Sequence, residues 1–161
     1  TGRDGDDGPS VAVRPWRRAA PGRVAHLVAR SGDAGRAGPP SLVRQTARRG
    51  ALKGRLDDWL HGRTRHRWAA VADGDVRALA VVDAYHHGGV HRLDVVVDPA
   101  WRGRVEVALV EAALACLSAA PGTPVEADVA VQDSPLRAAL VAAGFEPQRT
   151  LERMELWLGS R

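Results

Sequence analysis

Charged side chains gather in two apolar stretches that flank a Gly-Gly turn at positions 88 and 89. If the stretches form a hairpin with a symmetric turn, Asp83 faces Asp94 and Tyr85 faces Arg92 on one side of the sheet. Two carboxylates held close together push one pKa upward, which suits a general base or a pocket for a cation. We therefore predict Asp94, Asp83 and Tyr85 as catalytic residues. A solvent-facing sheet end, with Arg92 screening both acids, is the alternative.

A basic loop follows the second of these stretches. Residues 93–104 read Leu-Asp-Val-Val-Val-Asp-Pro-Ala-Trp-Arg-Gly-Arg, and an apolar helical pattern comes next. The free N–H groups and positive dipole end of a helix start, with Arg102 and Arg104 beside them, could hold a phosphate. A surface loop with solvated arginines is the alternative.

The elements that must position these residues begin with a candidate edge strand at 11–17. A helix is predicted at 21–30, a Gly/Pro-rich loop at 31–40 and a second helical stretch from Ser41 to about Gly62. Strands are then predicted at 67–72, 76–85 and 90–97, with Asp73-Gly74 as a hairpin turn between the first two. These three strands should pair antiparallel, because their connections are short.

The second half continues with a mostly buried helix at 102–119 and a strand at 125–131. A short helix should start at Ser134 as N-cap, with Pro135 at the first helical position, and stop at Gly144. A closing strand is predicted at 151–158. The order β-α-α-β-β-β-α-β-α-β predicts an α/β fold with a mixed, mostly antiparallel sheet and helices on both faces.

This element order, together with two motifs, resembles the GNAT superfamily of N-acetyltransferases over about residues 11–158. The first motif is Val-Asp-Pro-Ala-Trp-Arg-Gly at 97–103, and the second is the apolar helix ending in Gly-Phe at 134–145. The resemblance implies direct acyl transfer from acetyl-CoA to a primary amine of a small molecule or a peptide, with Asp94 or Asp83 taking the amine proton. It implies a cofactor site made by Val95, Val96, Val97, Arg102, Gly103, Arg104, Val105, Glu106, Val107, Ala108 and Ser134.

Three positions depart from the family pattern. Val105 and Val107 stand where glycines usually admit the pyrophosphate, and Leu140 stands where many members have a tyrosine that protonates the leaving thiolate. That proton would then come from solvent or from Tyr85. An N-acetyltransferase is our first interpretation. A catalytically degenerate GNAT-like binding or regulatory module, which could be part of a larger protein, is the second.

Composition narrows the remaining classes. The chain has 161 residues and 17.2 kDa, enough for one domain at 11–158 between a flexible tail at 1–10 and a short tail at 159–161. Cys116 is the single cysteine, which excludes an internal disulfide framework. Lys53 is the single lysine among 23 basic residues, as in GC-rich, bacterial-like coding. No apolar run reaches the roughly 18 residues of a membrane span, so a cytoplasmic protein is expected.

Charge is divided along the chain. Residues 1–67 carry 15 basic and 6 acidic residues, whereas residues 68–161 carry 8 and 13. A nucleic acid is not predicted as the partner, because Trp16 and Trp59 are the only aromatic residues of the basic half. No metal site is predicted, since the histidines at 86, 87 and 91 lack a further ligand pattern. An edge strand at either end could pair two subunits, so a homodimer is left open.

Overall fold

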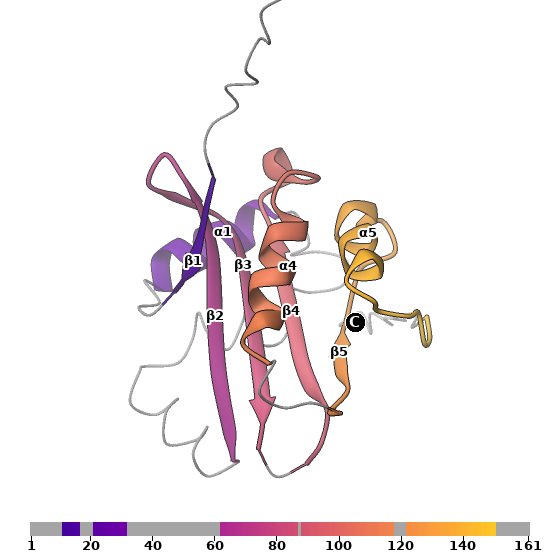
Figure 1. Ribbon diagram of the computed structural model, residues 1–161. Coiled ribbons are helices and arrows are strands. Elements are labelled where there is room, and N and C mark those ends of the chain that lie inside the picture. Colours follow the sequence, from indigo (N-terminus) through magenta and orange to yellow (C-terminus); the bar gives the residue numbers. More distant parts are fainter. Residues whose placement is uncertain (1–10, 17–20, 32–61, 87, 118–121, 151–161) are drawn as a thin grey trace, which may run out of the picture.

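The computed structural model describes residues 11–16, 21–31, 62–86, 88–117 and 122–150. Five strands form one sheet in the order β1-β2-β3-β4-β5 (Figure 1). β4 and β5 pair parallel, and the other neighbours pair antiparallel. The strands are β1 (Ala12–Pro15), β2 (Arg63–Ala72), β3 (Asp75–Tyr85), β4 (His91–Val97) and β5 (Val125–Ala127).

Helices cover both faces of the sheet, as the sequence predicts. α1 (Pro21–Arg30) lies on one face, and α4 (Glu106–Ala115) lies on the other with α5 (Ser134–Ala142) packed against it (Figure 1). A short 3-10 turn, Pro99–Trp101, connects β4 to the segment before α4. The predicted helical stretch at 41–61, the closing strand at 151–158 and both predicted tails lie outside the described residues.

Each face of the sheet buries its own core because alternate residues of a strand point to opposite sides. Toward α4 the strands present mostly alanine and valine, and α4 contributes Leu109, Val110 and Ala113, all fully buried. Toward α1 the strands present Val81, Leu79 and their neighbours against Val24 and Leu27. β3 therefore has residues buried on both faces, as a central strand should.

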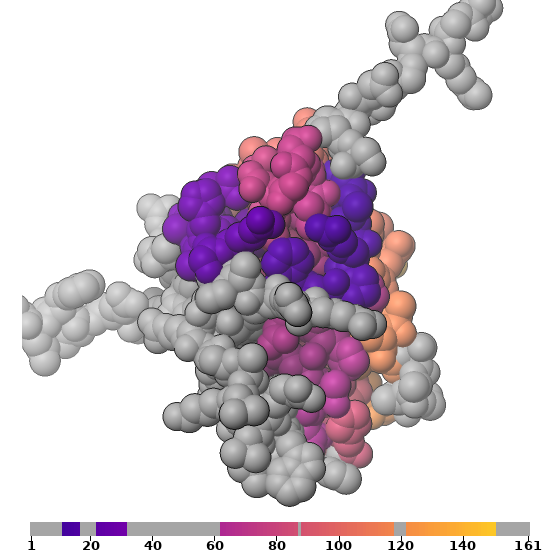
Figure 2. Space-filling model, turned by 90° about the vertical axis from the view of Figure 1, so that its left-hand side faces the viewer, coloured from indigo at the N-terminus to yellow at the C-terminus, as the bar shows by residue number. Residues whose placement is uncertain are grey.

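The β2–β3 hairpin has the tight turn that Asp73-Gly74 predicts. Ala72 pairs with Asp75, and both turn residues have positive φ angles, 52° and 77°. Two consecutive positive φ values are the pattern of a type I′ turn. The tip of this hairpin lies beside α1 (Figure 2), where Arg23 donates a hydrogen bond to the carbonyl of Gly74 at 3.2 Å.

Several predicted boundaries need correction. β2 starts at Arg63 instead of residue 67, β5 ends at Ala127 instead of residue 131, and α4 starts at Glu106 instead of residue 102. The N-cap of α5 is Asp133, whose carboxylate accepts from the N–H of Leu136, and Ser134 is the first helical residue. An aspartate caps as well as a serine, so local sequence did not separate the two.

Gly144 ends α5 as predicted. Its φ of 92° is left-handed, and the N–H of Phe145 donates to the carbonyl of Leu140 while the N–H of Gly144 donates to that of Val141. These two bonds form a Schellman motif, which favours glycine at this position.

Candidate functional site

The register of β3 and β4 differs from the predicted one. Asp83 pairs with Arg92, Asp94 pairs with Val81, and Tyr85 pairs with Arg63 of β2. The predicted facing pairs are therefore wrong by two residues, because the turn at 86–90 is not centred on its two glycines. A shift of two residues keeps side chains on the same face. Asp83, Asp94 and Arg92 thus still share the α1 side of the sheet, where Val81 packs.

Asp83 is held in a buried ion-pair cluster. Its side chain is 0% exposed, and its two carboxylate oxygens accept from Nε and Nη2 of Arg65 at 2.6 and 2.7 Å. Arg63 adds a second guanidinium at 3.4 Å. A carboxylate bound at both oxygens by one arginine is a strong, oriented pair. This geometry suits Asp83 to positioning the strands better than to taking a proton from a substrate.

Asp94 has a different environment. It lines a small open hollow together with Arg92, Glu126 and Asp128, and it is 6% exposed while the other three side chains are exposed. Arg92 and Glu126 face each other across the β4–β5 ladder. The described lining thus carries three carboxylates and one guanidinium, a composition that suits a cationic ligand.

The hollow lies where β4 and β5 stop pairing. The ladder runs from His91 opposite Val125 to Leu93 opposite Ala127. Beyond Leu93, β4 continues to Val97 with β3 on one side, and no further pair with β5 forms among the described residues. The edge of β4 at Val95, Val96 and Val97, where the cofactor's backbone contacts are predicted, therefore pairs with no described residue of β5.

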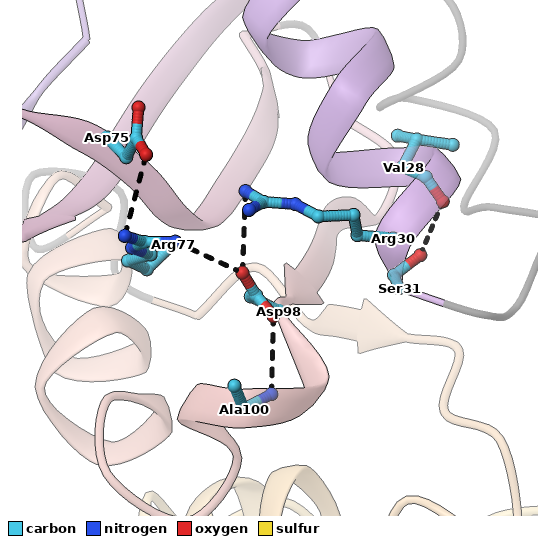
Figure 3. Close-up of polar contacts among 7 residues, drawn as sticks. All are labelled: Val28, Arg30, Ser31, Asp75, Arg77, Asp98 and Ala100. Carbon is cyan, nitrogen blue, oxygen red and sulfur yellow. Dashed lines mark hydrogen bonds and ion pairs between the residues drawn. The ribbon is translucent and has the colours of Figure 1, made fainter.

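The exit of β4 is fixed by Asp98 (Figure 3). Its carboxylate accepts from the N–H of Ala100 at 3.2 Å and forms ion pairs with Arg30 of α1 at 3.4 Å and Arg77 of β3 at 3.6 Å. Arg77 also reaches Asp75 at 3.5 Å. Three elements thus meet at one buried carboxylate, which sets the path of the chain toward α4.

The two arginines predicted to bind phosphate make contacts within the protein. Arg102 donates from Nη2 to the carbonyl of Ser31 at 3.1 Å, next to the end of α1. Arg104 is exposed, and its guanidinium lies 5.8 Å from the centre of the Trp101 ring, which Arg77 also approaches at 5.7 Å. Arg104 can turn toward an anion more readily than Arg102, since a cation–π contact at the surface is weak.

The loop before α4 holds an anion of its own. The carboxylate of Glu106 accepts from the N–H of Gly103 at 2.8 Å and from the N–H of Val105 at 3.1 Å. Glu106 is 2% exposed, and Gly103 has the left-handed φ of 79° that favours glycine. The first helical bond runs from the N–H of Leu109 to the carbonyl of Val105. Helix geometry therefore leaves the N–H groups at 106–108 for an outside acceptor.

The remaining predicted cofactor residues lie partly at the surface and partly in the core. Val105 is buried at 1% exposure, whereas Val107 is 54% exposed and Ala108 is exposed. Ser134 is exposed at the start of α5. Leu140, which stands at the tyrosine position, is 5% exposed and packs in the core between the sheet and α4.

Histidines lie near the turn end of the sheet. Thr64 Oγ1 lies 2.6 Å from Nε2 of His86, and Nδ1 of His91 accepts from the N–H of Tyr85. Burial, and to a lesser extent His86, lower the pKa of His66. Within the described ranges no three His, Cys, Asp or Glu side chains are grouped for a metal ion. In the same part of the chain, no helix is long and apolar enough to cross a membrane.

Comparison with known proteins places the fold. No protein-family model and no curated protein sequence matches the chain. Solved structures do match: a GNAT-family protein from Desulfovibrio desulfuricans has a TM-score of 0.61 at 18% identity, over 89% of each chain. Glucosamine-6-phosphate N-acetyltransferase from Arabidopsis thaliana has 0.58 at 14%, over 93% of this chain and 99% of its own. An aminoglycoside N-acetyltransferase in complex with CoA has 0.55 at 17%, over 93% and 97%.

These likenesses define the class of fold. The chain has a GNAT N-acetyltransferase-like fold, with a five-stranded, mostly antiparallel sheet flanked by helices among the described residues. The sequence had predicted this fold from its element order and its two motifs.

Two residues of the hollow were missed by sequence reasoning. Glu126 and Asp128 alternate with the apolar side chains of Val125, Ala127 and Val129, which is the pattern of a half-exposed strand. The pattern was available, but nothing local indicated that this strand would lie beside Arg92. A parallel pair joins residues that are far apart in sequence, so its register has no turn to reveal it.

Proposed function

We propose that the protein is an acyl-CoA-dependent N-acyltransferase that transfers an acyl group, namely acetyl, directly to a primary amine. The observation that carries this proposal is the hollow lined by three carboxylates at the point where the β4–β5 ladder ends. An amine is a cation at neutral pH, and it must lose a proton before it can act as a nucleophile. The hollow offers carboxylates for both tasks.

The chain's own residues divide these tasks. Glu126 and Asp128 are exposed and attract the ammonium group, while the more buried Asp94 accepts its proton, directly or through water. Arg92 stands opposite Glu126 and limits the negative charge. Asp83 stays with Arg65 and keeps β2 and β3 in register below the hollow.

The residues present fit an acyl-CoA donor in part. The edge of β4 at 95–97, which pairs with no described residue of β5, suits its amide-bearing arm, and the N–H groups at 106–108 with Arg104 suit a phosphate. The donor, when bound, supplies an acyl group activated as a thioester. Two solved proteins of similar fold are N-acetyltransferases named for amine-bearing substrates, and one is in complex with CoA, which supports this assignment.

The test is acetyl transfer to a panel of primary amines, with Asp94→Asn as the variant. We expect its turnover to fall by about tenfold or more, the scale of general-base catalysis. Asp128→Asn should instead raise KM, because it removes attraction for the amine and leaves Asp94 in place. Asp75→Asn, an exposed acid on β3 remote from the hollow's lining, is the matched control. Unchanged turnover in Asp94→Asn would refute the assignment of the base.

A binding module without catalysis is the second candidate, and the buried Leu140 favours it. A leucine at this position has no proton to give to a leaving thiolate, and it packs in the core at 5% exposure. The triple variant Val105→Gly, Val107→Gly, Leu140→Tyr separates the two candidates. Activity gained by the variant from an inactive wild-type chain favours the module, whereas activity that the wild-type chain has and the variant lacks favours the enzyme. Ligand binding by the wild-type chain with no transfer to any amine favours the module.

A further inference from the structure

Glu106 occupies an unusual position for a charged residue. It is the first residue of α4, it is 2% exposed, and both of its carboxylate oxygens accept from backbone N–H groups of the preceding loop. The oxygens take the N–H groups of Gly103 and Val105 separately, in the manner of a bound oxyanion. The N–H of Arg104, between them, donates to the carbonyl of Trp101. The three loop amides from Gly103 to Val105 are therefore all engaged by the chain itself.

We propose that Glu106 is a resident anion in the loop before α4 and determines which acyl donors the chain accepts. This inference rests on the proposed function. It concerns the N–H groups of the loop, to which a donor phosphate would bind if the carboxylate of Glu106 were absent. A phosphate that approaches must displace the carboxylate or bind at the first helical turn alone, with a buried negative charge beside it. Binding of donors that carry pyrophosphate is therefore weakened, while binding of a donor arm without phosphate is not.

The side chains around the loop make the carboxylate hard to displace. Val105 is buried at 1% exposure beside it, and Gly103 needs its left-handed φ to direct its N–H toward Oε1. Asp98 and its arginine partners hold the other end of the same loop. The carboxylate is thus held in place, and moving it away would leave two backbone N–H groups, one buried and one partly buried, without this partner.

The experiment measures binding, not turnover. CoA, inorganic pyrophosphate and pantetheine, which has no phosphate, are titrated by calorimetry into the wild-type chain, Glu106→Gln and Glu106→Ala. In Glu106→Gln the amide keeps one acceptor but turns an NH2 group toward the second N–H, so one loop amide is released and the charge is lost. Glu106→Ala releases both. We expect CoA and pyrophosphate to bind about tenfold tighter or more, since a hydrogen bond to a charged group contributes on that scale.

Two controls make the result specific. Glu111→Gln removes the same charge from an exposed position of the same helix and should leave every affinity unchanged within about twofold. Pantetheine should bind all variants equally. If the variants bind CoA no better than the wild-type chain, including the case in which none of them binds it, the inference is wrong. An equal gain in Glu111→Gln would also overturn it, because the effect would then be general electrostatics.

A second measurement needs no variant. In the amide NMR spectrum of the wild-type chain, the Gly103 and Val105 signals should stay in place when pyrophosphate is added, and movement at micromolar pyrophosphate would contradict the inference. The inference and the proposed function fail separately. Tighter pyrophosphate binding by Glu106→Ala without any amine acetylation would refute the proposed function and support the inference. Amine acetylation by the wild-type chain, with the same CoA affinity in the Glu106 variants, would refute the inference and support the proposed function.

Discussion

Removal of the Asp83 carboxylate should destabilise the fold strongly. Asp83 is 0% exposed, and its partner Arg65 has a side chain only 4% exposed. Asp83→Ala would remove the carboxylate that Arg65 and Arg63 share, and the Arg63 side chain is 11% exposed. Breaking a buried pair in this way costs about 3–5 kcal/mol. With a urea m-value of about 2 kcal/mol/M, the midpoint of unfolding should fall by about 2 M.

The assay is equilibrium unfolding in urea, followed by circular dichroism. Asp75→Ala is the matched control, because its carboxylate is 62% exposed and 3.5 Å from Arg77. An exposed pair of this kind contributes less than about 1 kcal/mol. The double variant Asp83→Leu, Arg65→Met should recover part of the loss, since it removes one of the two arginine charges that face Asp83. If Asp83→Ala unfolds within about 1 kcal/mol of the wild-type chain, Asp83 is not the structural anchor inferred here.

Two further predictions concern a helix end and a histidine. Gly144→Ala should lower the free energy of unfolding by about 1–2 kcal/mol, because φ is 92° there. The control Gly22→Ala in α1, with no atom within 4 Å of the new Cβ, should be neutral or stabilising. Equal losses of stability in urea unfolding of the two variants would contradict this. Since its pKa is lowered in the folded chain, His66 binds a proton more readily when unfolded. Stability should therefore decrease as pH falls below about 6.5, and less so in His66→Gln; an NMR titration of His66 at or above its ordinary pKa would refute the cause.

Local signals account for the parts of the fold that the sequence predicted well. The spacing of Val24, Leu27 and Val28 on one helical face predicted α1 with the bounds that the structure has. Asp73-Gly74 predicted a hairpin because its turn type requires two positive φ values. In each case residues close in sequence determine the geometry.

Longer-range geometry accounts for the errors. The turn between β3 and β4 spans residues 86–90, and nothing in those residues alone selects the pairing of Asp83 with Arg92 over that with Asp94. The approach of Arg63 and Arg65 to Asp83 needed β2 to begin four residues earlier than its apolar pattern indicated. Polar residues at the start of a strand look like loop in sequence, and only their buried partner makes them part of the sheet.

The contact made by Glu106 had no signal in sequence at all. An acidic residue in the first turn of a helix is common and normally indicates a favourable interaction with the helix dipole. Whether its carboxylate faces solvent or folds back onto the preceding loop depends on the rotamer and on the path of that loop. Here the path is set by Asp98 and by the left-handed φ of Gly103.

The loop before α4 and the hollow beside β4 differ in the side chains that line them. In the loop, the carboxylates of Asp98 and Glu106 are buried and have arginine or backbone N–H partners within the chain. The described lining of the hollow has three carboxylates and a single arginine, and Glu126 and Asp128 are exposed. Under the proposed function, this contrast assigns the cationic amine to the hollow, because exposed acids attract a cation from solvent and the buried acids of the loop do not.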